Sequence, residues 1–202
     1  WNPSQYNADN LLGHTRDFCA ESFGEDHAEE AASLLNLVCK YNGRITSEML
    51  DASVYTCDEF EQVVNEYRAL ETRALRLFLE LKPECQDAYR QIVLFPVQAM
   101  GNIYEMYYAQ AMNRQLASVG DPDANAWAER CRQAFRRDSM LCLYYNKVMS
   151  GGKWDGMMIQ KHISYRTWND NYRADVCPRL VSVPEPENGP VFSPKDGYII
   201  SR

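Results

Sequence analysis

The sequence has few of the residues and motifs on which metal and catalytic sites depend. It holds three histidines, none with a glutamate three residues before it, although a di-iron bundle needs Glu-x-x-His on each of two helices. None of the seven cysteines forms the C-x-x-C pair that zinc knuckles and thioredoxin-type sites use. Walker, H-E-x-x-H and G-x-S-x-G motifs are missing as well. We therefore expect no metal, no cofactor and no catalytic residue in this chain.

Long apolar runs and clustered positive charges are also missing. No stretch approaches the roughly 18 apolar residues of a membrane-spanning helix. The formal net charge is −7, whereas a nucleic-acid surface needs clustered Lys and Arg. We therefore expect neither a membrane span nor a nucleic-acid partner. The first residues show no basic start followed by an apolar run, so we predict no signal peptide in this chain.

What the sequence does contain is a series of amphipathic helical patterns, in which apolar residues recur at spacings of three and four. These patterns predict helices over about residues 9–22, 26–42, 58–81, 84–118 and 123–149. Because the helices are long and their connections short, we predict an all-α fold, an antiparallel bundle of about five helices. Most of the cysteines fall on the apolar helix faces, so we favour their packing as small hydrophobes over disulfide bonds.

Three local details of these helices can be predicted. In the first helix, the expected core-facing residues are Leu11, Leu12, Thr15, Phe18 and Cys19. The third helix is expected to be capped by Asp58, with Glu61 three residues on, as a capping box prefers. In the fourth helix, Pro96 cannot donate a hydrogen bond to the carbonyl four residues earlier, so we expect a kink there.

The composition changes after Gly152. The following segment is rich in aromatic residues and methionine with little helical period, and five prolines lie between Pro178 and Pro194. We therefore divide the chain into a helical bundle domain, residues 1–152, and an aromatic, Pro-rich, non-helical tail, residues 153–202, that packs on the bundle. Residues 197–200 could begin a strand, and a single strand needs sheet partners, which we expect beyond the end of this segment.

Four tail side chains are candidates for contact with a carbohydrate or with another domain: Trp154, His162, Tyr165 and Trp168. Trp and Tyr rings stack on sugar faces, and His can hydrogen-bond to hydroxyl groups. The alternative is that these rings only pack the tail onto the bundle, which is favoured because large aromatic side chains are more often buried than exposed.

The tail resembles a stretch of glycoside hydrolase family 115, the xylan α-1,2-glucuronidases. In that family, the end of a helical domain reads roughly G-G-K-W-x-x-M-M-x-x-x-H-I-G-Y-x-x-W, followed by N-x-M-P. The matching residues are Gly151, Gly152, Lys153, Trp154, Met157, Met158, His162, Ile163, Tyr165, Trp168 and Pro178. Departures are Ser164 for glycine, Asp175 for asparagine and Cys177 for methionine. Residues 1–3, 23–24, 28–30, 40–44 and 94–97 are also similar, so the resemblance covers about residues 1–178.

The resemblance implies a multidomain parent enzyme, secreted or periplasmic, that removes (4-O-methyl-)glucuronic acid side groups from xylan with inversion. In the family, the catalytic carboxylates lie in a barrel domain before the helical domain, and a β-sandwich follows it. Nothing in this chain matches the barrel, so no catalytic residue can be transferred to it.

On this interpretation, the chain is a non-catalytic helical accessory domain of an α-glucuronidase. It braces the catalytic barrel and organises domain or subunit contacts, with the barrel, the β-sandwich, xylan and a second copy of the parent as expected partners. A free-standing carbohydrate-binding or protein-interaction module is the alternative hypothesis. A complete enzyme within 202 residues is disfavoured because no nucleophile or acid–base set can be assembled.

Overall fold

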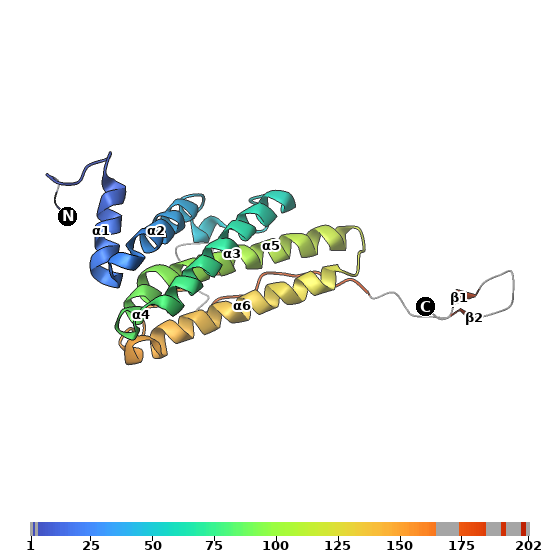
Figure 1. Ribbon diagram of the computed structural model, residues 1–202. Helices are drawn as coiled ribbons and strands as arrows, with labels where there is room; N and C mark the ends of the chain where they lie inside the picture. The colour runs from blue at the N-terminus through green and yellow to red at the C-terminus, as the bar shows by residue number, and fades with distance from the viewer. Residues whose placement is uncertain (1, 3, 165–173, 185–190, 193–198, 201–202) are drawn as a thin grey trace.

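The structure is a computed structural model that describes residues 2, 4–164, 174–184, 191–192 and 199–200 (Figure 1). Within these ranges the α-helices are α1 (Leu11–Phe23), α2 (Ala28–Asn42), α3 (Cys57–Glu80), α4 (Pro83–Tyr89), α5 (Phe95–Ser118) and α6 (Ala124–Lys147). Short 3₁₀ turns lie at Glu25–His27, Ser47–Met49 and Met149–Gly152. Two short strands, β1 (Val191–Phe192) and β2 (Ile199–Ile200), pair antiparallel with each other inside this chain.

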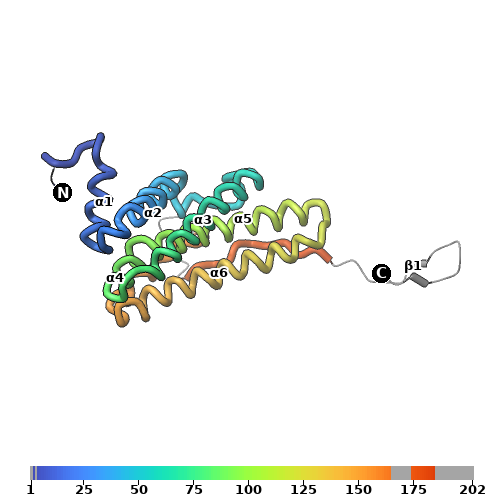
Figure 2. The backbone as a smooth tube through the Cα atoms, viewed as in Figure 1, coloured from blue at the N-terminus to red at the C-terminus, as the bar shows by residue number. Residues whose placement is uncertain are grey.

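The predicted all-α bundle of about five helices is confirmed. Helix α5 lies next to both α3 and α6, and α5 and α6 run antiparallel along most of their length (Figure 2). The predicted fourth helix corresponds to α4, a π-helical turn at Arg90–Leu94 and α5. The interruption expected at Pro96 therefore takes the form of a π turn that ends two residues before the proline, which lacks the N–H that a regular helix needs there.

The buried side chains form two clusters that meet at the middle of the bundle. One lies between α1, α2, the end of α3 and α4, and includes Leu34 and Tyr89. The other lies between α3, α5 and α6 and includes Phe60 and Tyr104. In the second cluster, the rings of Tyr67 and Tyr104 stack with their centroids 4.9 Å apart, which joins α3 to α5. Helix α5 is thus enclosed by its neighbours, and this position explains why polar residues on it are buried.

The prediction for the core-facing side of the first helix is partly wrong. Cys19 is buried as expected, but Leu11 and Leu12 are 48% and 68% exposed, and Phe18 is 38% exposed. Helix α1 packs chiefly on α2, and its buried residues, Cys19 and Phe23, both lie in its second half. The start of α1 extends beyond α2 (Figure 1), so the apolar residues there have no helix to pack against among the described residues.

The predicted cap of the third helix is also wrong, by two residues. Thr56, not Asp58, is the N-cap of α3: its hydroxyl oxygen accepts a hydrogen bond from the backbone N–H of Glu59 at 3.3 Å. The Glu59 carboxylate in return accepts one from the backbone N–H of Thr56 at 3.0 Å. Both residue pairs have the capping-box spacing, and a hydroxyl three residues before a glutamate is the commoner form.

Replacing Thr56 by alanine is expected to lower the free energy of unfolding by about 1 kcal/mol, because the first turn of α3 loses its capping oxygen. Chemical denaturation followed by circular dichroism at 222 nm measures this loss. The control is Asp58→Ala, which removes a first-turn charge but no cap and should cost less than about 0.5 kcal/mol. Equal losses in the two variants would contradict the assigned cap.

Candidate functional site

Two described stretches of the tail, residues 157–164 and 174–184, run along the surface of α5 and α6, and we call them the strap. In Figure 2 the strap is the orange and red segment beside these helices. It has no helix or strand of its own, so its backbone N–H and C=O groups need partners from elsewhere.

Asparagine side chains of the bundle supply many of these partners. The Asn113 amide accepts from the backbone N–H of Val181 at 2.9 Å and donates to the carbonyl oxygen of Val181 at 2.8 Å. Asn125 makes the same pair of bonds with Val183, at 3.0 and 2.7 Å. Each amide therefore binds the extended strap backbone as a neighbouring β-strand would, with one bond given and one received.

A third reciprocal pair and one single bond extend this pattern. Asn146 accepts from the backbone N–H of Met158 at 2.9 Å and donates to its carbonyl oxygen at 2.8 Å. The Gln110 amide donates to the carbonyl oxygen of Arg179 at 2.9 Å. The strap is thus fastened at positions spread along both α5 and α6.

His162 is fastened differently, between two carboxylates. Its Nε2 lies 3.0 and 3.1 Å from the two carboxylate oxygens of Asp138, a buried residue of α6. Its Nδ1 lies 3.0 Å from the carbonyl oxygen of Gln160 and 3.3 Å from a carboxylate oxygen of Asp175. The other oxygen of Asp175 accepts from the backbone N–H groups of His162 and Ile163, at 2.8 and 2.6 Å. This arrangement draws residues 160–163 and 175 together against α6.

The electrostatics of this group favour a charged imidazole. The hydrogen bond with Asp138 is the largest of the effects that raise the pKa of His162 to about 9, against the opposing effect of burial. Cys142 lies one helical turn after Asp138, and burial, together with the charges of Asp138 and Asp175, raises the pKa of its thiol to about 12. At neutral pH the imidazole of His162 is therefore protonated and the thiol of Cys142 is neutral.

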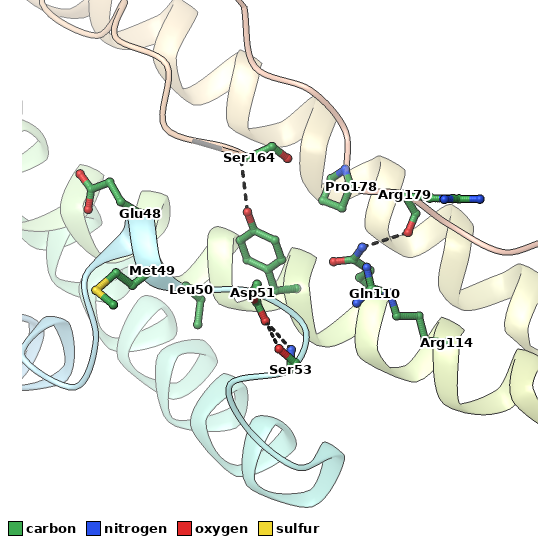
Figure 3. A pocket seen from close by; sticks show the side chains of 11 residues that line it. Glu48, Met49, Leu50, Asp51, Ser53, Gln110, Arg114, Ser164, Pro178 and Arg179 are labelled. Carbon is green, nitrogen blue, oxygen red and sulfur yellow. Dashed lines mark hydrogen bonds between the residues drawn. The ribbon is translucent and has the colours of Figure 1, made fainter. Parts of the chain in front are cut away.

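Two pockets border the strap. The first has a volume of about 280 Å³ and lies between the turn near Ser47–Met49, α5 and the strap (Figure 3). Tyr107 lines this pocket, and its hydroxyl oxygen accepts a hydrogen bond from the backbone N–H of Ser164 at 3.4 Å. Its lining combines Glu48 and Asp51 with Arg114, so its charge selects neither anions nor cations. The second, about 370 Å³, borders Asp138, Cys142 and His162.

The four candidate contact residues are placed as follows. Trp154 is half-buried; the Lys153 ammonium lies 4.8 Å from the centre of its ring, and its indole N–H is buried without an acceptor in the described part of the chain. His162 points into the bundle at Asp138. Tyr165 and Trp168 lie outside the described residues. The expectation that these residues contact a carbohydrate or another domain stays a prediction.

Sequence reasoning singled out His162 but missed its partners, Asp138 and Asp175. The only available signal was the position of Asp138, a charged residue one turn from Cys142 on an apolar helix face, and a charge there needs a partner. The distance of 24 residues between Asp138 and His162 hides the pairing in the sequence.

The helices and the strap together define a helical bundle domain. No protein-family profile and no curated protein matches the chain. Among solved structures it is similar to a family GH115 4-O-methyl-α-glucuronidase with specificity for decorated arabinogalactans, with a TM-score of 0.61 and 16% sequence identity over 93% of this chain. The match confirms a GH115-like helical fold, and the chain corresponds to 25% of the length of that enzyme.

None of the helices within the described ranges is both long and apolar enough to cross a membrane. The seven cysteines, all of them in the described part of the chain, are free thiols.

Proposed function

We propose that this chain is the non-catalytic helical domain of a multidomain glycoside hydrolase that resembles the family 115 α-glucuronidases, and that it braces the catalytic barrel. The observation that carries the proposal is the fold match, which takes in 93% of this chain but only 25% of the hydrolase. A domain of this kind stabilises the enzyme by holding its neighbours in one arrangement, and a catalytic site depends on such support.

An apolar stripe on the outer face of α6 supports this role. Met140, Leu143 and Val148 are 69%, 59% and 55% exposed, and Tyr144 lies beside them. Their spacing of three, one and four residues places them on one side of the helix. Exposed apolar side chains gathered on one face mark a contact surface, and we propose that the barrel of the parent enzyme packs here.

The substrate belongs to the proposal as well. The solved relative acts on decorated arabinogalactans, whereas the family resemblance of the sequence implies xylan. We propose a secreted enzyme that removes 4-O-methylglucuronic acid groups from a polysaccharide, with glucuronoxylan as the first substrate to assay and decorated arabinogalactan as the second.

The test compares the full-length parent protein with its Met140→Ser/Leu143→Ser variant. Both side chains are exposed, so the isolated 202-residue chain should keep its unfolding midpoint. In the full-length protein we expect a lower unfolding temperature and a several-fold lower kcat/KM for glucuronic acid release, because the barrel loses its support. Activity and differential scanning calorimetry measure these effects.

The matched control is Val119→Ser, at the end of α5, where the valine is 77% exposed but lies off the α6 stripe. It should leave the full-length protein unchanged. If the double variant also behaves like the wild type, the bracing role is wrong. If the isolated chain binds either polysaccharide by itself in isothermal titration, the alternative of a free-standing carbohydrate-binding module gains support instead.

A further inference from the structure

Three side chains with metal-binding atoms meet where the strap crosses α6. Asp138 and Cys142 are four residues apart on α6 and therefore face the same way, and His162 reaches them from the strap. A carboxylate oxygen of Asp138, the sulfur of Cys142 and a ring nitrogen of His162 all lie within 4.8 Å of one another. Among the described residues, no other group of three His, Cys, Asp or Glu side chains brings such atoms together.

We propose that Asp138, Cys142 and His162 bind one Zn²⁺ ion through a carboxylate oxygen, the sulfur and Nε2. Zinc accepts carboxylate, thiolate and imidazole ligands with bond lengths of about 2.0 to 2.3 Å. Ligands around a tetrahedral ion are then roughly 3.3 to 3.8 Å apart. The 3.0 and 3.1 Å between Nε2 and the Asp138 oxygens would open by only a few tenths of an ångström to admit the ion.

The orientation of the His162 ring supports this assignment. A zinc-binding histidine usually donates its second ring N–H to a carbonyl or carboxylate oxygen, which fixes the ring and increases its basicity. Nδ1 of His162 has both kinds of acceptor, the Gln160 carbonyl at 3.0 Å and the Asp175 carboxylate at 3.3 Å. Nε2 is therefore the nitrogen left to face Asp138 and Cys142.

The site also has an open side. Asp138, Cys142 and His162 all line the pocket of about 370 Å³, together with Met157 and Met158. Zinc sites that bind water or a small ligand have three protein ligands and a fourth coordination position that faces a pocket. On binding, the ion takes the place of the proton on Nε2 and of the proton on the thiol. When the site starts with a protonated imidazole and a neutral thiol, each ion that binds therefore releases two protons to the buffer.

Cobalt and zinc titrations of the 202-residue chain under reducing conditions test the proposal. Cobalt should give the visible absorption of a tetrahedral ion together with a thiolate-to-cobalt charge-transfer band, and zinc should displace it with one ion bound per chain. Cys142→Ser should abolish the charge-transfer band and weaken zinc binding at least tenfold. Cys85→Ser, which removes another half-buried thiol far along the sequence, is the matched control and should bind as the wild type does.

Absence of the charge-transfer band in the wild type, or equal loss of zinc in Cys142→Ser and Cys85→Ser, would overturn the proposal. Where Cys142→Ser fails to fold, X-ray absorption of zinc bound to the wild type decides. The site requires one sulfur ligand, and a zinc ion without a sulfur ligand would refute it. These outcomes are independent of whether the chain braces a hydrolase, because they concern only its own three ligands.

Discussion

Replacing Asn113 by leucine is expected to lower the free energy of unfolding by roughly 3 to 4 kcal/mol, one of the two largest effects predicted for this chain. Asn113 is fully buried, and its amide makes three hydrogen bonds: two with the backbone of Val181 and one, at 2.8 Å, to the carbonyl oxygen of Ala124. Leucine fills similar space but removes all three bonds, and the carbonyl oxygen of the fully buried Ala124 loses this donor, which adds a cost beyond the bonds themselves.

Chemical denaturation of the wild type and the variant measures this loss, and hydrogen exchange locates it. The backbone N–H of Val181 should lose its protection in Asn113→Leu while the interior of α3 keeps its own. Asn125→Leu is the comparison, because the side chain of this half-buried residue makes two bonds, both with Val183, and its loss should cost about half as much. A change below about 1 kcal/mol in Asn113→Leu would show that the strap contributes little to stability.

Raising the pH from 6.5 to 9 is expected to remove roughly 2 to 3 kcal/mol of stability through His162 alone. The pKa of this histidine is raised from 6.5 to about 9 in the folded chain, first by its hydrogen bond with Asp138. Below pH 6.5 both the folded and the unfolded chain carry the proton, so the full contribution is present. As the pH rises towards 9 the unfolded chain loses the proton first, and the contribution disappears.

Unfolding curves at several pH values, recorded with a chelator so that no metal replaces the proton, measure this effect. His162→Gln keeps a hydrogen-bonding side chain but cannot titrate. The free energy of unfolding of this variant should therefore lack the part of the pH dependence that comes from His162. The difference between the wild type and the variant isolates this group, because the thiols and the other titrating groups are common to both. Parallel curves over the whole range would contradict an ion pair between His162 and Asp138.

Whether the sequence predicts a feature of the fold depends on how far apart in the chain the interacting residues lie. In α3 the apolar residues Tyr67, Leu70, Ala74 and Leu77 follow one another at spacings of three and four, and all of them are buried. Their spacing of three and four residues is enough, because a helix brings such neighbours to one side whatever surrounds it. Gly152 marks the end of the helical part with φ at +81°, a conformation that glycine adopts without strain.

The first helix and the cap of α3 show the limit of this reasoning. Leu11 and Leu12 have the right spacing for burial, but whether a second helix extends far enough to cover them is decided by how α1 packs on α2. Thr56 and Asp58 both stand three residues before a glutamate, and only the backbone conformation of Thr56 selects the cap. For the candidate site, the sequence indicated Trp154 and His162 as notable residues but gave no partner for either.

By itself, then, the sequence determined the helices, their order and the change of character after Gly152, since each depends on residues only a few positions apart. The tertiary structure decided what the tail does. The bonds between Asn113 and Val181 join residues 68 positions apart, and those between Asp138 and His162 join residues 24 apart. No periodic pattern records such pairs, because a polar side chain on a helix looks the same in sequence whether it faces water or a strand of backbone laid against it.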